Sequence, residues 1–334
     1  MNFTEFQQSR EQLLADRGST LLDCSGTNLY AALNHLIPAE SAGPTHTVHR
    51  CHLASEWCAH FGLTPETSRR ALISCGVRDS LARLFSHYSA AGTVSLWLPA
   101  DNYPVYHELA REAGLSPHEF QTLPQPVWPS SSSDPAAEAE VILVTNPMKP
   151  LGRYLNSDDI STLTAWLRAS RQRRLILDAV YTFECQFHPS TLQLMETGQV
   201  ILLHSLTKGW LQPRLFGVTL VLPDDAKSLT EAFRLQPPSQ HKLARAREML
   251  AGHTGMPSLV AREIAAARDR MRTALRESFA LPASSSPESS SYFIPVQANW
   301  RDLLDSNNIL GIPASAFGSG HRDITILSCV SFME

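Results

Sequence analysis

The sequence predicts an α/β fold in which a mainly parallel sheet is sandwiched by helices, with a smaller α+β domain beside it. Continuous apolar runs of strand length occur at residues 141–144, 175–177 and 200–203, and a stretch of helical periodicity at 157–170 separates the first two. Strands that are apolar throughout indicate a sheet buried on both faces, and their alternation with helices indicates parallel strands. Ligands of such sheets gather beyond the carboxyl ends of the strands.

The elements before this core follow the same pattern. Apolar residues at helical spacing predict an N-terminal helix over residues 4–17, and short β-rich runs predict strands at 71–74 and 94–99. Gly76 follows the first of these strands, and a helix begins after it. Such a step presents free backbone N–H groups and the positive end of a helix dipole to an anion, although strand–glycine–helix steps are common in α/β proteins.

The character of the chain changes after residue 221. Gln236-Pro-Pro-Ser resembles a hinge, a long helical stretch follows at 241–279, and strands are predicted at 292–296 and 323–327. We therefore expect three regions: residues 1–40 as an N-terminal segment that joins the smaller domain, 41–235 as the larger, ligand-binding domain, and 236–334 as the smaller C-terminal domain.

Composition narrows the class of protein. A chain of 334 residues can hold one large and one small domain, and its net charge of −4 gives no reason to expect a nucleic acid or an anionic membrane as partner. The six cysteines are scattered without metal-type spacing, which is typical of reduced thiols and predicts neither a disulfide framework nor a metal site. No apolar run approaches the roughly 18 residues that span a bilayer, and the first residues lack a signal-peptide pattern. We expect a soluble, cytoplasmic protein.

One lysine has a context suited to chemistry. Lysine occurs only at positions 149, 208, 227 and 242. The polar surroundings of Lys227 and Lys242 predict solvated side chains, and Lys149 lies between two prolines. Lys208 follows the apolar run 200–203 among small and hydroxyl residues, where burial and positive charge lower the pKa of an amine so that it can attack a carbonyl. A lone loop lysine is usually solvated, but two upstream stretches favour a Schiff base here.

Those stretches and the lysine loop together resemble a known family. Residues Val141–Gly152, Leu175–Tyr181 and Ser205–Lys208 are similar, in this order, to the N-P-x-N-P-T-G, D-x-x-Y and S-x-x-K motifs of the class I/II aminotransferases. The resemblance extends over most of the chain. It implies a fold-type I enzyme that uses pyridoxal 5'-phosphate (PLP), bound to Lys208 as an internal aldimine. It also implies a homodimer, because in the family a neighbouring subunit completes the active site.

The resemblance implies roles for individual residues. Asp178 would keep the pyridine nitrogen protonated, Tyr181 would hydrogen-bond the phenolic oxygen, and Lys208 would move a proton between substrate and cofactor. A packed strand-end aspartate is the alternative for Asp178. The other cofactor-binding positions are those of the phosphate, the ring and the phenolic side: Gly76, Val77, Arg78, Ser205 and Arg214 for the phosphate, Tyr103 stacked on the ring (or a packed core tyrosine), and Asn146 and Lys149. Asn28, in the segment that lines the mouth of the site, and Arg322 would bind substrate.

Four positions depart from the family motifs, one of them Leu151, which stands where the family has threonine. Lys149 stands where the family has its second asparagine, and its alternatives are to stabilise a phenolate, to bind a phosphate or an acidic substrate group, or to lie at the surface. Arg214 stands where glycine is usual, one residue having been lost from the motif. Arg322 precedes the strand on which the family carries its carboxylate-binding arginine.

We expect a PLP-dependent aminotransferase that transfers an amino group between a small-molecule amino acid, or a related amine, and a 2-oxo acid. Because the carboxylate-binding region departs most, the alternative is a PLP-dependent lyase, decarboxylase or oxidase that acts on an amino acid through the same quinonoid chemistry. A non-catalytic relative is the third hypothesis, and the joint presence of Lys208, Asp178 and Tyr181 argues against it.

Overall fold

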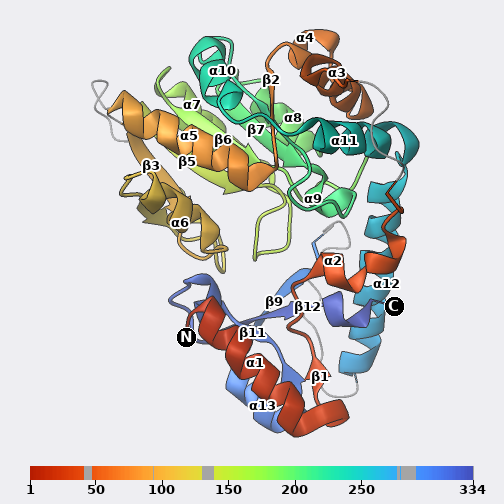
Figure 1. The fold of residues 1–334 in the computed structure, drawn as a ribbon. Helices are drawn as coiled ribbons and strands as arrows, with labels where there is room; N and C mark the ends of the chain where they lie inside the picture. Colours follow the sequence, from red (N-terminus) through yellow and green to blue (C-terminus); the bar gives the residue numbers. More distant parts are fainter. Residues whose placement is uncertain (41–46, 93, 130–138, 277–278, 280–290, 334) are drawn as a thin grey trace.

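The chain forms a larger and a smaller part joined by a long helix. The computed structural model describes residues 1–40, 47–92, 94–129, 139–276, 279 and 291–333. Figure 1 shows the larger part around its sheet and the smaller part, which carries the N-terminus, at the opposite end, with α12 (Met256–Arg276) running between them. Within the described ranges, no helix is long and apolar enough to cross a membrane.

The larger part is built on a seven-stranded sheet with the order β2-β8-β7-β6-β5-β3-β4. Its strands are β2 (Ala71–Ser74), β3 (Val94–Pro99), β4 (His118–Phe120), β5 (Ala139–Thr145), β6 (Arg174–Asp178), β7 (Val200–Ser205) and β8 (Gly217–Leu220). All neighbours are parallel except β8, which is antiparallel to both β7 and β2. The chain between β7 and β8 is too short for the crossover of a dozen or more residues that a parallel neighbour needs. The predicted α/β class with a mainly parallel sheet is confirmed.

Helices cover both faces of this sheet. Leu143 and Ile176 belong to the core shared with α5 (Val77–Ala91), α6 (Val105–Glu112) and α10 (Ala226–Arg234). Their neighbours Ile142 and Leu177 belong to the core shared with α3 (Arg50–His60), α7 (Ser157–Arg168) and α8 (Pro189–Met195). Because side chains alternate between the faces of a strand, strands covered on both faces must be apolar at successive positions, which explains the continuous apolar runs of the sequence.

The smaller part combines short strands with helices from both ends of the chain. Strands β11 (Ile312–Pro313), β12 (Ile324–Ser328) and β9 (Phe293–Gln297) form an antiparallel sheet, and β1 (Leu22–Asp23) pairs with β10 (Ile309–Leu310). The N-terminal helix α1 (Phe3–Arg17) lies against this part, where Arg17 pairs with Asp305 of α13 (Trp300–Asn307) at 3.2 Å. The remaining short elements are η1 (Gly18–Thr20), α2 (Leu29–Ala32), η2 (Asn34–Leu36), α4 (Pro65–Ser68), α9 (Leu206–Gly209), η3 (Ala314–Phe317) and η4 (Val330–Phe332).

Helix α11 (Gln240–Gly252) belongs to the larger part by its contacts. It packs on α3, and the indole of Trp210, just after α9, donates to the carbonyls of Met249 and His253 at 3.2 and 3.1 Å. The predicted boundary at residue 236 lies before this helix, and it stays a prediction. The predicted boundary at residues 40 and 41 falls at the start of the range 41–46, which lies outside the described residues.

Candidate functional site

The predicted motifs meet at one edge of the larger sheet. Asn146 follows β5, Asp178 ends β6, and Ser205 ends β7. These three strands are mutually parallel, so their carboxyl ends lie side by side. Lys208 follows on the short helix α9, whose first turn is capped by the Ser205 hydroxyl, which accepts from the amide of Thr207 at 3.3 Å. The parallel arrangement of β6 and β7 therefore brings Asp178 and Lys208 to the same edge of the sheet.

Asp178 is a buried carboxylate with fixed partners. Asp178 is 3% exposed. One of its carboxylate oxygens accepts from the hydroxyl of Tyr106 at 2.7 Å, and the other accepts from the amide of Val180 at 3.0 Å. Burial raises the pKa of Asp178, whereas these two hydrogen bonds and the charges of Lys149 and Lys208 oppose that rise. The same neighbours that orient the carboxylate thus favour its anionic form.

Two lysine amines lie around the ring of Tyr181. The amine of Lys149 contacts the ring face, and the Nζ of Lys208 lies 5.2 Å from the ring centroid. Burial and the nearby charge of Lys208 hold the pKa of Lys149 well below its usual range, while Asp178 acts in the opposite direction. Of the alternatives for Lys149, a surface position is wrong, because the side chain lies beside Tyr181 and Lys208.

A tyrosine of the smaller part completes this group, so the site lies between the two parts. The hydroxyl of Tyr292 lies 3.1 Å from that of Tyr181, and Tyr292 is 2% exposed. Burial raises the pKa of Tyr292, and the charge of Lys208, together with a hydrogen bond to it, opposes that rise. Tyr292 precedes β9, which is far from Lys208 in the sequence, and only the packing of the two parts brings them together.

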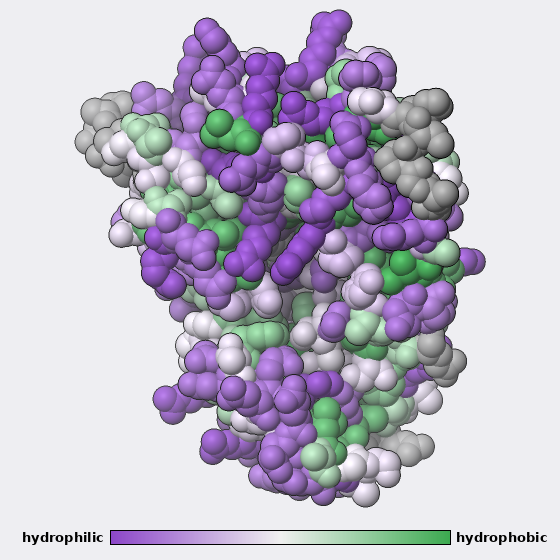
Figure 2. All heavy atoms as spheres, in the orientation of Figure 1, coloured by the Kyte–Doolittle hydropathy of each residue, from purple (hydrophilic) through white to green (hydrophobic). Residues whose placement is uncertain are grey.

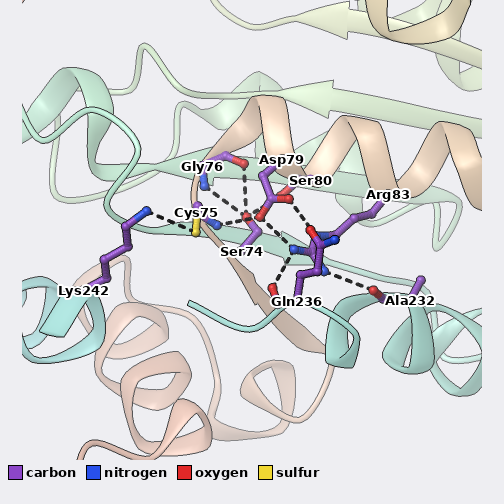
Figure 3. Close-up of polar contacts among 9 residues, drawn as sticks. All are labelled: Ser74, Cys75, Gly76, Asp79, Ser80, Arg83, Ala232, Gln236 and Lys242. Atoms are coloured by element: carbon purple, nitrogen blue, oxygen red, sulfur yellow. Dashed lines mark hydrogen bonds and ion pairs between the residues drawn. The ribbon is translucent and has the colours of Figure 1, made fainter. Parts of the chain in front are cut away.

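The turn before α5 is shaped for an anion. Gly76 has a φ of 138°, a conformation that favours glycine, and the amides of Val77 and Arg78 begin α5 without helical acceptors. The amide of Gly76 itself donates to the hydroxyl of Ser74 at 3.2 Å. A Cβ on Gly217 of β8 would lie 2.6 Å from the Cα of Gly76, so only glycine allows this strand to approach the turn. Figure 3 shows the turn with its hydrogen bonds.

Helix α9 lies close to this turn. A Cβ built on Gly76 would be 3.9 Å from the hydroxyl oxygen of Thr207, the residue before Lys208. The N-termini of α5 and α9 are therefore neighbours. Backbone N–H groups at such termini, together with the hydroxyls of Ser205 and Thr207, are the donors that a phosphate accepts from. Thr207 was missed by sequence reasoning, although it lies inside the S-x-x-K motif.

The other predicted residues are engaged by other partners or exposed. The side-chain NH2 group of Asn146 donates to the hydroxyls of Ser190 and Thr191 at 2.9 and 2.8 Å, and its side-chain oxygen accepts from the backbone amide of Leu155. Tyr103 is 48% exposed and contacts the ring of Phe3. The rest lie at exposed positions: Arg78, 4.0 Å from Glu108, Asn28, which caps α2, Arg214, with a φ of 58°, and Arg322. A left-handed φ at Arg214 agrees with a position where glycine is usual.

A buried histidine lies beneath the lysine loop. His204, next to Ser205, is fully buried among Trp57, Phe61 and Trp210, and its Nδ1 accepts from the Trp57 indole at 3.1 Å. Its Nε2 finds no hydrogen-bond partner among the described residues. Burial, assisted by the neighbouring His60, lowers the pKa of His204 to about 3. The end of β7 therefore depends on a neutral imidazole.

We expect His204 to make the protein labile to acid. Between pH 6.5 and about 3 the unfolded chain binds a proton at His204 that the folded chain does not, so the free energy of unfolding falls as the pH is lowered through this window. The slope from this group is at most about 1.4 kcal/mol per pH unit. Urea unfolding between pH 7.5 and 4.5 should show a shallower decline in His204→Gln, which keeps an acceptor for Trp57. The exposed control His52→Gln should keep the wild-type slope, and an equal slope in all three proteins would contradict the assignment.

Comparison with known proteins decides the family. The family model for aminotransferase class I and II matches residues 31–324. The chain belongs to this family. No curated protein sequence matches it significantly.

Solved structures agree with the family in fold. A probable N-succinyldiaminopimelate aminotransferase from Thermus thermophilus superposes with a TM-score of 0.72 at 20% identity, covering 98% of this chain and 95% of the other. The aminotransferase AspB from Helicobacter pylori gives 0.70 at 16% identity, with coverages of 97% and 93%. YbdL from Escherichia coli, described as having a methionine aminotransferase function, gives 0.68 at 15%, with coverages of 98% and 92%. At these identities the likeness shows a shared fold.

The donor set of this aminotransferase fits PLP, the cofactor of the family. A buried carboxylate, two amines and two phenols lie within one group, and two helix N-termini with hydroxyls lie at the adjoining turn. The carboxylate suits a protonated ring nitrogen, an amine suits an aldehyde, and the turn suits a phosphate. In the described part of the chain no group of three or more His, Cys, Asp or Glu residues could hold a metal ion.

Proposed function

We propose that this protein is an aminotransferase that moves an amino group between an amino acid, or a related amine, and a 2-oxo acid, with PLP held at Lys208 as a Schiff base. The observation that carries the proposal is the gathering of Lys208, Asp178 and Tyr181 around one point at the carboxyl ends of β6 and β7. PLP supplies an aldehyde that condenses with amines and a ring that withdraws electrons. Residues of the chain would bind and orient the cofactor and move protons.

Asp178 would hold a proton on the ring nitrogen. A carboxylate fixed by Tyr106 and by the amide of Val180 cannot turn away, and its negative charge favours a protonated partner. Tyr106 acts here as a positioning residue. Asp178 is thereby the residue that keeps the ring electron-withdrawing.

Lys208 would hold the cofactor through its aldehyde, and its amine would move a proton to and from the substrate. Tyr181 would donate to the phenolic oxygen, and Tyr292, bonded to both Tyr181 and Lys208, would hold the lysine in place. Because burial lowers the pKa of the adjacent Lys149, that amine is suited to sit beside the phenolic oxygen as a neutral donor or to gain a proton when an anion arrives.

The phosphate would lie at the turn of Gly76, Val77 and Arg78, with Ser205 and Thr207 as hydroxyl donors. Asn28, Tyr103, Asn146, Arg214 and Arg322 stay predictions. We also propose a homodimer, because members of this family are usually dimers. A cytoplasmic location stays a prediction that rests on the scattered cysteines of the sequence.

The proposal is tested by the two half-reactions. Purified protein loaded with PLP should show a visible absorption band that an amino donor alone converts to the pyridoxamine spectrum, and a 2-oxo acid alone should then restore it. Conversion should need one equivalent of donor and release one equivalent of the matching oxo acid. Product formation that continues without any amino acceptor would replace transamination by elimination, decarboxylation or oxidation. Absence of any cofactor band after PLP is added would refute the proposal.

A further inference from the structure

A phosphate at the turn of Gly76, Val77 and Arg78 favours positive charge nearby, and the predicted residues do not supply it. A phosphate ester carries close to two negative charges at neutral pH, and charge-assisted donors bind it more strongly than neutral ones. Arg78 is exposed and directed to Glu108, and Arg214 is exposed on a left-handed backbone. Arg83 is engaged by Asp79 and by two carbonyls. Each arginine near the turn in sequence or in the predicted motif is therefore at the surface or already committed.

One further cation reaches the turn from another helix. The amine of Lys242, on the first turns of α11, lies 3.6 Å from the Sγ of Cys75, the residue that precedes Gly76. This is the only side-chain hydrogen bond that Lys242 makes within the described residues, and a thiol is a weak acceptor for an ammonium group. Lys242 is half-buried, and its contact with Cys75 is part-buried. An ammonium held at a turn with so weak a partner is suited to an anionic one.

The backbone that carries Lys242 is fixed to the same turn. Arg83 donates to the carbonyls of Ala232 and Gln236 at 3.0 and 2.7 Å, and it pairs with Asp79. Asp79 in turn accepts from the amide of Cys75 at 2.9 Å. In Figure 3, Lys242 reaches Cys75 from one side of the turn while Arg83 holds the chain before α11 on the other.

Contacts at the start of α11 fix its position further. Ser239 caps the helix by accepting from the amide of Lys242 at 3.4 Å, and the side chain of Gln240 accepts from the amide of Val48 at 2.9 Å. These contacts hold the start of α11 where the amine of Lys242 meets Cys75, beside the N-terminus of α5.

From these contacts we propose that Lys242 supplies the positive charge for the phosphate group of the cofactor, in the place of an arginine after Lys208. The inference rests on the proposed binding of PLP. It assigns Lys242 to the phosphate alone, because α11 reaches the turn and the contacts of Lys208, Asp178 and Tyr181 involve other residues. Lys242 is a binding residue in this proposal and has no part in the proton transfers.

The test compares PLP with pyridoxal, which has the same aldehyde and ring but no phosphate. Dissociation constants of both are measured by absorption titration for wild type, Lys242→Gln, Lys242→Arg and the exposed control Lys227→Gln. We expect Lys242→Gln to weaken PLP about tenfold to a hundredfold, the range of one charge-assisted hydrogen bond. It should leave pyridoxal unchanged. Lys242→Arg should retain most of the PLP affinity, and Lys227→Gln should change neither constant.

Each other outcome refutes a distinct statement. Equal weakening of PLP and pyridoxal in Lys242→Gln would show a structural role, and no weakening of either would show that Lys242 does not meet the phosphate. Both results would overturn the inference while the cofactor proposal stands. If wild-type protein bound neither compound, the cofactor proposal itself would fall. Inorganic phosphate gives a second readout, since it should compete with PLP more strongly in wild type than in Lys242→Gln.

Discussion

Lys208→Ala is expected to reduce the rate of the amino-donor half-reaction by at least about 10⁴-fold, because it removes both the nucleophile and the proton carrier. The visible band of the bound cofactor should be lost with it. Single-turnover absorption measurements with an added amino acid check both expectations. Methylamine in the buffer should restore part of the rate, since a free amine can replace the missing one only in a site that is otherwise intact.

Lys149 offers a second candidate amine for the Schiff base, so the same experiment can compare the two lysines. It is the second amine beside Tyr181, and it has a pKa held low by burial and by Lys208. We expect the visible band to survive in Lys149→Met and to disappear in Lys208→Ala, with Lys227→Ala as the surface control. A band that persists in Lys208→Ala and is lost in Lys149→Met would move the Schiff base to Lys149.

Asp178→Asn is expected to slow the same half-reaction by about 10² to 10⁴-fold, the range typical of a lost acid–base group. The amide has nearly the shape of the carboxylate: its oxygen can accept from the amide of Val180 while its NH2 group donates to the hydroxyl oxygen of Tyr106. It has no charge to hold a proton on the ring nitrogen. Stopped-flow absorption with a saturating donor measures the effect. Tyr106→Phe should cost far less, because it leaves the carboxylate and removes one of its two partners.

The stability of Asp178→Asn shows whether a slower reaction reflects lost catalysis or a damaged fold. Burial raises the pKa of Asp178, which means that the charged form is costly in the fold. Replacing it with a neutral side chain should therefore leave the free energy of unfolding unchanged or raise it, as measured by urea denaturation at pH 7.5. A variant that is both unstable and slow would indicate a structural role for Asp178, and one that is active within a few-fold of wild type would contradict its assignment.

The sheet and the motif lysine were predictable because their signals are local. Each central strand is an apolar run such as 200–203, and the polar residue that ends it is adjacent in sequence. The parallel arrangement of β5, β6 and β7 then places Asp178 and Lys208 at one edge without further information. The antiparallel direction of β8 also follows from a local fact, the short connection after Lys208.

Residues that depend on packing between distant elements were not predictable. Tyr103 and Tyr106 lie three residues apart, and which of them faces Asp178 depends on where α6 begins and how it packs. Tyr292 reaches Lys208 only because the smaller part lies against the larger one. Lys242 had the sequence context of a solvated residue, and only the packing of α11 brings it to Cys75. In each case the missing information is a tertiary contact with no trace in the neighbouring sequence.

The bonds from Arg83 to Ala232 and Gln236 bear on how the molecule would open and close. They anchor the stretch that enters the Pro237-Pro238 pair to α5, so these prolines travel with the larger part instead of acting as a pivot. A bend between the two parts would then lie beyond α11, at residues 253–255 or within α12. A swing about that point would carry Tyr292 toward or away from Lys208 but would leave Gly76 and Lys242 in register. The contacts that Gly76 and Lys242 would make with the phosphate would thus stay unchanged, while the side of the site that binds substrate is exposed and covered.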